Sequence, residues 1–249
     1  MNKMMTMLFV AAYAAMLHGG DVERLEELEH ICGFVPSDDL RRPQVIPTPD
    51  DIIAKYHITT NQLVADLKSI VMKYSIREED KFKRWIRESA VGELWRYCGT
   101  NELAFLSTIM TNNSDYAQHA AMCASICILT HSSELVDLAR GIITNTTVYS
   151  ERLRDWTCYL LFDKCREDSG AVYITDSAIR TQIAALFVEL AGINTDLVIT
   201  VDRCACDLNP WYRHSQQRRE NLARLRPPGL TGRPAEIYDA AQRGAAQED

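Results

Sequence analysis

The sequence has little glycine, no excess of positive charge and no apolar run long enough for a membrane helix. Only 11 of its 249 residues are glycine, which leaves little material for loops that cradle phosphates. The net charge of −7 gives no support for non-specific nucleic-acid binding, because that binding needs a positive field to displace counterions. A membrane-crossing helix needs about 20 consecutive apolar residues. The uncharged stretch Met4–Ala12 is too short.

Sequence signatures of catalysis are also missing. The chain contains no G-x-S-x-G turn, P-loop, Rossmann glycine pattern, paired-carboxylate signature or HExxH motif. His119, Cys123 and Cys127 stand one helical turn apart from each other, but a single helix offers poor tetrahedral geometry for a metal. The residues around them are apolar and indicate a core helix. We therefore expect no metal and no cofactor.

What the chain does contain is the composition of a globular protein. Hydrophobic residues make up 47% and charged residues 24% of the sequence, so disorder of the whole chain is excluded. The length suits one large domain or two small ones. A chain of this size buries roughly 70% or more of its unfolded surface, so its core needs neither disulfides nor metals.

Hydrophobic periodicity is helical along nearly the whole chain. One predicted buried face consists of apolar residues spaced three or four positions apart: Leu63, Val64, Leu67, Ile70, Val71 and Tyr74. Tyr116–Thr130 is apolar around most of its circumference and is predicted to be a central helix, and Trp211–Leu225 is predicted as the last helix. Leu197–Val201 is the best strand candidate, but its flanks predict a helix. The predicted fold class is all-α, with antiparallel helix pairs stacked as a short α-α superhelix; an irregular helical bundle is the alternative.

Capping residues mark where these helices start and stop. Short polar side chains accept hydrogen bonds from the first free N–H groups of a helix, and glycine suits the position after its last turn. The predicted N-caps are Thr59 or Thr60, Ser132 or Ser133, Ser150, and Thr175 or Asp176; the predicted C-caps are Gly99 and Gly192.

Two helical segments read alike at an interval of about 35 residues, Tyr116–Cys127 and Glu151–Phe162, each with a cysteine in the matching place. Asp176–Leu186 and Asn209–Arg219 share a polar cap followed by an arginine on the first turn. The pattern resembles the helix pairs of HEAT and armadillo repeats over Thr48–Leu225. That resemblance implies that each pair stacks on its neighbours to hide an apolar face.

The N-terminus combines a basic start, an apolar stretch and the small residues around Tyr13. This order is typical of a secretory signal peptide, which we predict over residues 1–14. Export to the periplasm or the outside follows if it is cleaved, whereas a retained segment implies a cytoplasmic protein. The alternative is an amphipathic first helix, Met4–Leu17, ended by Gly19 and Gly20.

Charge and proline define the remaining organisation. An acidic helix and a proline-rich connector occupy residues 15–47, a helical-repeat domain occupies 48–226, and a flexible tail is predicted for 227–249. Acidic residues dominate Asp21–Asp39 and basic residues dominate Arg213–Arg233. The eight cysteines predict one or two disulfides at most, because several have the spacing of buried helix positions.

One segment combines aromatic and basic residues and is the predicted ligand site. Its residues are Trp211, Tyr212, Arg213, His214, Arg218 and Arg219, a set able to hold an anionic or peptide ligand. The predicted function is a noncatalytic helical-repeat scaffold that binds a protein or peptide partner, not nucleic acid. An enzyme whose site is assembled from distant helices remains the alternative, and a cytosolic adaptor follows if the first helix is retained.

Overall fold

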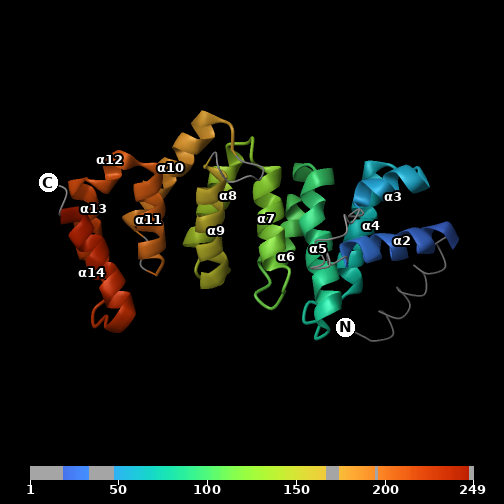
Figure 1. Cartoon of the computed structure of the whole chain (residues 1–249), viewed down its shortest axis with the longest axis horizontal. Helices are drawn as coiled ribbons and strands as arrows, with labels where there is room; N and C mark the ends of the chain where they lie inside the picture. The colour runs from blue at the N-terminus through green and yellow to red at the C-terminus, as the bar shows by residue number, and fades with distance from the viewer. Residues whose placement is uncertain (1–18, 34–47, 167–173, 194–195, 247–249) are drawn as a thin grey trace, which may run out of the picture. The chain divides into compact units, whose positions relative to one another are not determined.

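The computed structural model describes residues 19–33, 48–166, 174–193 and 196–246, and the regular elements of these residues are all helices (Figure 1). The predicted all-α fold class is confirmed for them. The elements are α2 (Gly19–Cys32), α3 (Pro49–Tyr56), α4 (Thr60–Lys73), α5 (Lys81–Tyr97), the short 3₁₀ helix η1 (Thr100–Glu102), α6 (Leu103–Met110), α7 (Gln118–Ile128), α8 (Glu134–Thr144), α9 (Glu151–Lys164), α10 (Ser177–Ala191), α11 (Val198–Leu208), α12 (Pro210–Arg213), α13 (Gln216–Leu225) and α14 (Gly232–Ala246).

The chain divides into two compact units. The first unit takes residues up to Glu102 together with Ser114–Ala124. The second takes Leu103–Asn113 and the chain from Ser125 onward. Each unit has its own buried apolar side chains, so each is described by itself.

Local capping explains where several helices begin. Thr59, Ser150 and Asp176 each accept a hydrogen bond from a backbone N–H in the first turn of the following helix, as the sequence predicts. Asp80 caps α5 in the same way by accepting from Phe82. Gly192 ends α10 as predicted, whereas the C-cap of α5 is the residue before the predicted glycine.

In the first unit, α4 and α5 form a hairpin that packs against α2 (Figure 1). Helix α2 also contacts α3, which the chain reaches through a capping box at Thr48. Leu28, Leu67 and Leu94, one from each of α2, α4 and α5, are fully buried. The acidic segment, as far as the structure describes it, therefore lies in a packed helix of this unit.

In the second unit, two successive hairpins stack on each other. Helix α8 packs on α9 and α10 packs on α11. In addition, α8 contacts α10 and α9 contacts α11. The first helices of the two hairpins therefore pack on each other, and so do the second helices. Helices α13 and α14 follow, and both contact α11. The predicted stacking of helix pairs is thus observed within this unit.

A buried arginine links consecutive elements of the first unit. Arg87 of α5 donates to the carbonyl of Val71, in the last turn of α4. The same guanidinium donates to the carboxylate of Asp115, which precedes α7, at 2.5 Å. Both ionic side chains are almost completely buried. The arginine therefore connects the end of one helix to the approach to another.

The second unit repeats this arrangement. Arg154 of α9 donates to the carbonyl of Ile143, in the last turn of α8, and to the carboxylate of Asp196, which precedes α11. In both hairpins the arginine lies on the second helix. A guanidinium only donates hydrogen bonds, and here it donates to a carbonyl in the last turn of the preceding helix, which has no partner within that helix. The two contacts give the hairpins α4–α5 and α8–α9 a common internal bond.

The predicted last helix, Trp211–Leu225, is interrupted. Helix α12 ends at Arg213, and the Ser215 side chain then caps α13 by accepting from the N–H of Arg218 at 3.2 Å. A new N-cap requires extended backbone, so the helix cannot pass through this position.

The chain after Arg226 also differs from the prediction. The sequence predicts a flexible tail for residues 227–249, whereas the structure forms α14 there. Tyr238 causes the difference, because its ring is buried against Val198 and Leu222 with an exposed fraction of only 1%. Leu230 and Ala241 pack at the edge of the same cluster, so the chain after Arg226 has an apolar anchor that its sparse pattern did not indicate.

All eight cysteines are free, which lies within the predicted limit of one or two disulfides at most. Five of them are buried, in line with their helical spacing. The prediction of helix for Leu197–Val201 is confirmed, because α11 runs through it. The signal-peptide prediction for residues 1–14 lies outside the described residues.

Candidate functional site

The predicted ligand site does not assemble as one surface. Trp211 is 61% exposed, whereas the adjacent Tyr212 is fully buried, their rings meeting edge to face with centroids 6.1 Å apart. Arg218 is buried in an ion pair with Asp202 of α11, at 3.1 Å. The remaining members are on the surface or near it: Arg213 pairs with Asp207, Arg219 donates to Gln216, and His214 is exposed. Successive helical residues diverge by about 100°, so they cannot all face one ligand.

An open hollow of about 320 Å³, lined by apolar atoms and by several charged side chains, lies beside this segment, between α11 and the end of α14. It is lined by Ile199, Asp202, Arg203, Cys206, Asp207, Arg213, Arg218, Ala241 and Gly244. Burial raises the pKa of the Asp202 carboxyl, although the Arg218 guanidinium acts in the opposite direction. Burial also raises the pKa of Cys206 to about 12, so this thiol is protonated at neutral pH. The buried pair holds helices together and leaves no activated nucleophile here.

A second and larger hollow, of about 520 Å³, lies between the start of α11 and the chain leading into α14. Most of its lining is apolar, and Ile199 borders both hollows. The lining residues are Glu151, Asp196, Leu197, Val198, Ile199, Thr200, Pro227, Leu230, Arg233, Pro234, Ile237 and Tyr238. Its volume falls in the range of small-ligand and side-chain pockets.

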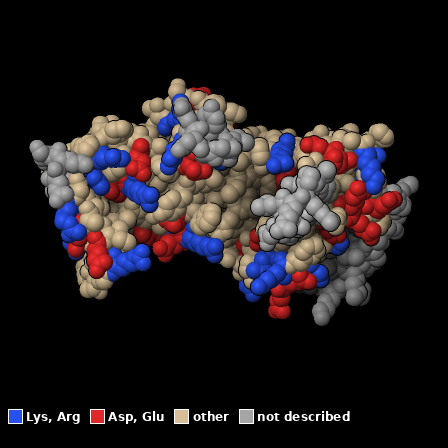
Figure 2. Space-filling model, viewed as in Figure 1, with Lys and Arg blue, Asp and Glu red and all other residues tan. Residues whose placement is uncertain are grey.

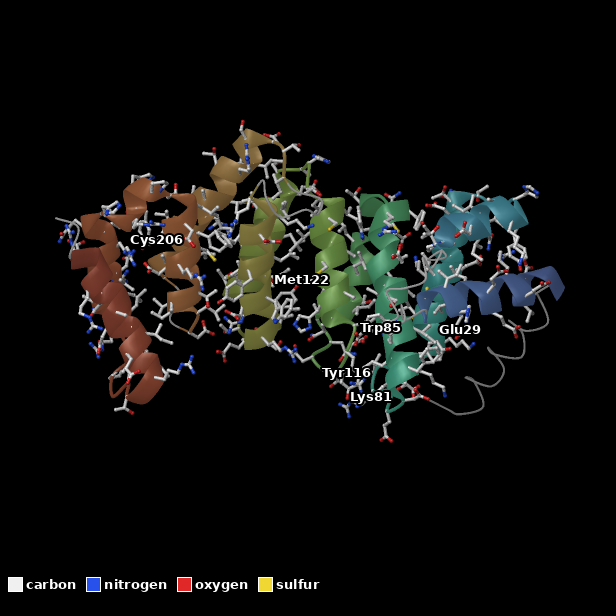
Figure 3. The ribbon with its side chains drawn as sticks, viewed as in Figure 1. Glu29, Lys81, Trp85, Tyr116, Met122 and Cys206 are labelled. Carbon is white, nitrogen blue, oxygen red and sulfur yellow. The ribbon has the colours of Figure 1, made fainter. Side chains whose placement is uncertain are left out.

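Exposed aromatic side chains mark a different surface in the first unit. Trp85 of α5 is 46% exposed, although the opposite face of its helix is buried. The guanidinium carbon of Arg84 lies 3.7 Å from the centroid of the Tyr116 ring, and this tyrosine is itself exposed. Figure 3 shows Trp85, Tyr116 and Lys81 in the same region of the unit. We call Lys81, Arg84, Trp85 and Tyr116 the α5 aromatic surface.

The second unit exposes aromatics on the equivalent helix. Trp156 is 50% exposed and Tyr159, one turn later on α9, is exposed as well. The buried side of α9 carries Leu153 and Leu161 instead. We call Trp156 and Tyr159 the α9 aromatic surface. The sequence signal that could have predicted this surface is the position of its aromatic residues on the polar side of an amphipathic helix.

Both tryptophans face away from the buried arginines. Trp85 precedes Arg87 by two residues and Trp156 follows Arg154 by two, which places each about 200° around its helix from the arginine. Gly92, seven residues after Trp85, shares the same face of α5, and a side chain added there would meet no atom within 4 Å. Neither tryptophan is needed to fill a core.

The charged ends of the sequence are largely neutralised within their own units. Glu27 of α2 pairs with Lys55 at 2.5 Å, and Glu29 pairs with Lys73 at 2.7 Å. The hydrogen bond from Lys55 is the main cause that lowers the pKa of Glu27. On the face seen in Figure 2, basic atoms lie beside acidic ones over both units. This face therefore shows no large area of a single charge sign over the residues that the structure describes.

The described residues contain neither a candidate metal cluster nor a candidate membrane-spanning helix. Across residues 19–33, 48–166, 174–193 and 196–246, His, Cys, Asp and Glu side chains form no group of three able to hold a metal ion. None of the helices that the structure describes combines the length and apolar character needed to cross a membrane.

Comparison with protein-family models, with curated proteins and with solved structures gives no match to this chain. The role of its surfaces is therefore inferred from their own geometry. The two aromatic surfaces and the two hollows beside α14 are the features that a core of packed helices does not require.

Proposed function

We propose that the protein is a noncatalytic helical-repeat scaffold that binds a protein or peptide partner. The observation that carries the proposal is the pair of half-exposed tryptophans, Trp85 and Trp156, each on the outward face of the second helix of a hairpin. Tryptophan, tyrosine and arginine dominate the energetics of protein interfaces, and the α5 aromatic surface combines all three. Large exposed aromatics on a chain that can bury its other apolar residues favour a binding role.

The HEAT or armadillo resemblance supports the same proposal. Stacked hairpins within the second unit and the common arginine bond of α4–α5 and α8–α9 are features expected of repeats that share a continuous core. Repeat proteins use the exposed faces of corresponding helices as extended binding surfaces. The α5 and α9 aromatic surfaces would be two such faces.

Peptide display against the full chain tests the proposal. Selected peptides are titrated against the wild type, Trp85→Ala and Trp156→Ala by fluorescence anisotropy. Loss of a central aromatic at an interface costs at least about 2 kcal/mol, so each peptide should bind about 30-fold more weakly to one of these variants. Trp211→Ala is the matched control, because Trp211 is also exposed but belongs to neither aromatic surface.

Two results would overturn this assignment. Loss of binding only in Trp211→Ala would show that the binding site is the Trp211–Arg219 segment predicted from the sequence. Product release by the purified chain in a panel of hydrolase and transferase assays would favour an enzyme instead. Export remains part of the proposal, and mass spectrometry of the native protein tests it: an N-terminus at Ala15 supports a cleaved signal, and an intact Met1 opposes it.

A further inference from the structure

The two hollows beside α14 adjoin each other, and they differ in the charged side chains that line them. Ile199 of α11 borders both, so the hollows are adjacent along the same helix. The larger hollow lies against Ile237 near the start of α14, and the smaller lies against Gly244 near its end. Helix α14 docks on α11 and α13 through Tyr238, which packs against Val198 and Leu222. We call this feature the α11–α14 groove.

The apolar end of the groove is suited to a hydrophobic group. Leu197, Val198, Leu230 and Ile237 line it, and Ile237 is 45% exposed there. Leu197 and Val198 are already buried, so an apolar group that entered would remove mainly Ile237 and Leu230 from water, at about 25 cal/mol for each Å² buried. The hollow is large enough to take a leucine or phenylalanine side chain.

The other end of the groove carries surplus positive charge. Three arginines and two aspartates line the smaller hollow. Arg218 is bound to Asp202, and Arg213 is bound to Asp207 at 3.0 Å. No ion pair engages Arg203 within the part of the chain that the structure describes, and this side chain is exposed. The complementary ligand group is therefore an anion.

We infer that the α11–α14 groove binds a peptide segment in which an apolar side chain lies close to a carboxylate. The apolar side chain occupies the end at Ile237, and the carboxylate pairs with Arg203, with Arg213 as a second donor. Placement of the carboxylate at the other end is disfavoured, because Glu151 and Asp196 lie there. This site is separate from the α5 and α9 aromatic surfaces, so it does not depend on the function proposed for them.

The full chain is tested with two dyes of the same apolar body. One is 8-anilinonaphthalene-1-sulfonate, which carries an anionic group, and the other is neutral N-phenyl-1-naphthylamine. Arg203→Glu should weaken binding of the anionic dye about tenfold or more and leave the neutral dye within about twofold. Ile237→Asp should weaken both dyes. Arg152→Glu and Ile193→Asp are the matched controls, because both residues are exposed on the second unit and line neither hollow.

Displacement experiments then identify the peptide chemistry. The peptide Ac-Phe-Leu-Glu-Glu-NH2 should displace the anionic dye, and its twin Ac-Phe-Leu-Gln-Gln-NH2 should do so at least about tenfold less well. Gly244→Glu places a carboxylate at the cationic end, where an added side chain meets no atom within 4 Å. That variant should weaken the anionic dye, whereas Gly244→Gln should not.

The inference is overturned by any of three results. The first is equal binding of the anionic dye to the wild type and Arg203→Glu, or no binding of either dye. The second is dye binding that is lost in Trp85→Ala or Trp156→Ala, which would place the dye on the aromatic surfaces. The third is equal displacement by the two peptides. Circular dichroism and the unfolding midpoint of each variant show that it remains folded.

Discussion

Arg87 and Asp115 meet at 2.5 Å although 28 residues separate them in the chain, and both side chains are almost entirely buried. The guanidinium also satisfies the Val71 carbonyl at the end of α4. A buried charge must be matched by its partners, because the low-dielectric interior provides no solvation. The pair therefore fixes how the α4–α5 hairpin meets the segment that follows it.

Substitution of this arginine should destabilise the first unit strongly. In Arg87→Ala, Asp115 keeps a buried charge without its partner, so the free energy of unfolding should fall by about 3–5 kcal/mol. Urea denaturation followed by tryptophan fluorescence measures the change. Arg96→Ala is the control, since its ion pair with Glu93 is partly exposed and weak at 3.4 Å, and it should alter stability by less than about 1 kcal/mol. A loss equal to the control would contradict the role given to Arg87.

The ion pair of the second unit predicts a dependence of stability on pH. The hydrogen bond from Arg154 lowers the pKa of Asp196 in the folded state. An acid whose folded pKa is depressed stabilises the fold above its unfolded pKa of about 3.9, and that stabilisation is lost as the pH falls through the folded pKa. The urea midpoint should therefore drop below about pH 4, and Asp196→Asn should flatten this drop.

Asp163→Asn serves as the control for the pH experiment, since Asp163 is an exposed carboxylate of the same unit. Its profile should follow that of the wild type. If Asp196→Asn and the wild type show the same slope between about pH 3 and pH 5, the lowered pKa does not contribute to stability.

The buried thiols should resist modification in the native chain. Burial raises the pKa of Cys32, Cys204 and Cys206 to about 12, so very little thiolate is present at pH 8. Titration with a chromogenic disulfide should modify the partly exposed thiols first, namely Cys98, Cys123 and Cys127. Unfolding in urea without a reductant should then make all eight thiols available to the reagent. Fewer than eight would show that disulfides form after all.

Helix α14 should depend on a single side chain. The hydroxyl of Tyr238 donates to the carbonyl of Leu222, and its ring is the one large side chain that α14 buries among the described residues. Tyr238→Ala should strongly reduce hydrogen-exchange protection of the α14 amides, because the other contacts of this helix, the Arg226–Asp239 ion pair and the packing of Ala241, are partly exposed. Ile237→Ala should leave the protection intact. Equal protection in both variants would show that α14 is held by other contacts.

Local features of the fold were accessible from sequence because capping acts over three residues. Thr59, Ser150 and Asp176 each carry the side chain that their following helix needs, and each caps it. The interruption at Ser215 follows the same rule, but the helical pattern of Trp211–Leu225 obscured it. For α14, one tyrosine among small and polar residues gave too sparse a pattern to indicate packing.

The candidate site was harder to predict, because it depends on contacts between distant residues. Nothing local shows that Arg218 turns inward, since its partner Asp202 lies 16 residues earlier on another helix. The neighbours Trp211 and Tyr212 point in different directions, and only the packing of α12 decides which is buried. The exposure of Trp156, in contrast, follows from the apolar residues on the opposite face of α9, and helical periodicity could have indicated it.

Gly92 would affect how α5 meets the proposed protein or peptide partner. A glycine within a helix lowers its stability by about 0.5–1 kcal/mol relative to alanine, and no neighbouring atom here forbids a side chain. Bare backbone on the outward face lets another polypeptide approach α5 more closely than any side chain would permit. Replacement by alanine should therefore make the isolated protein more stable and, at the same time, a poorer receptor.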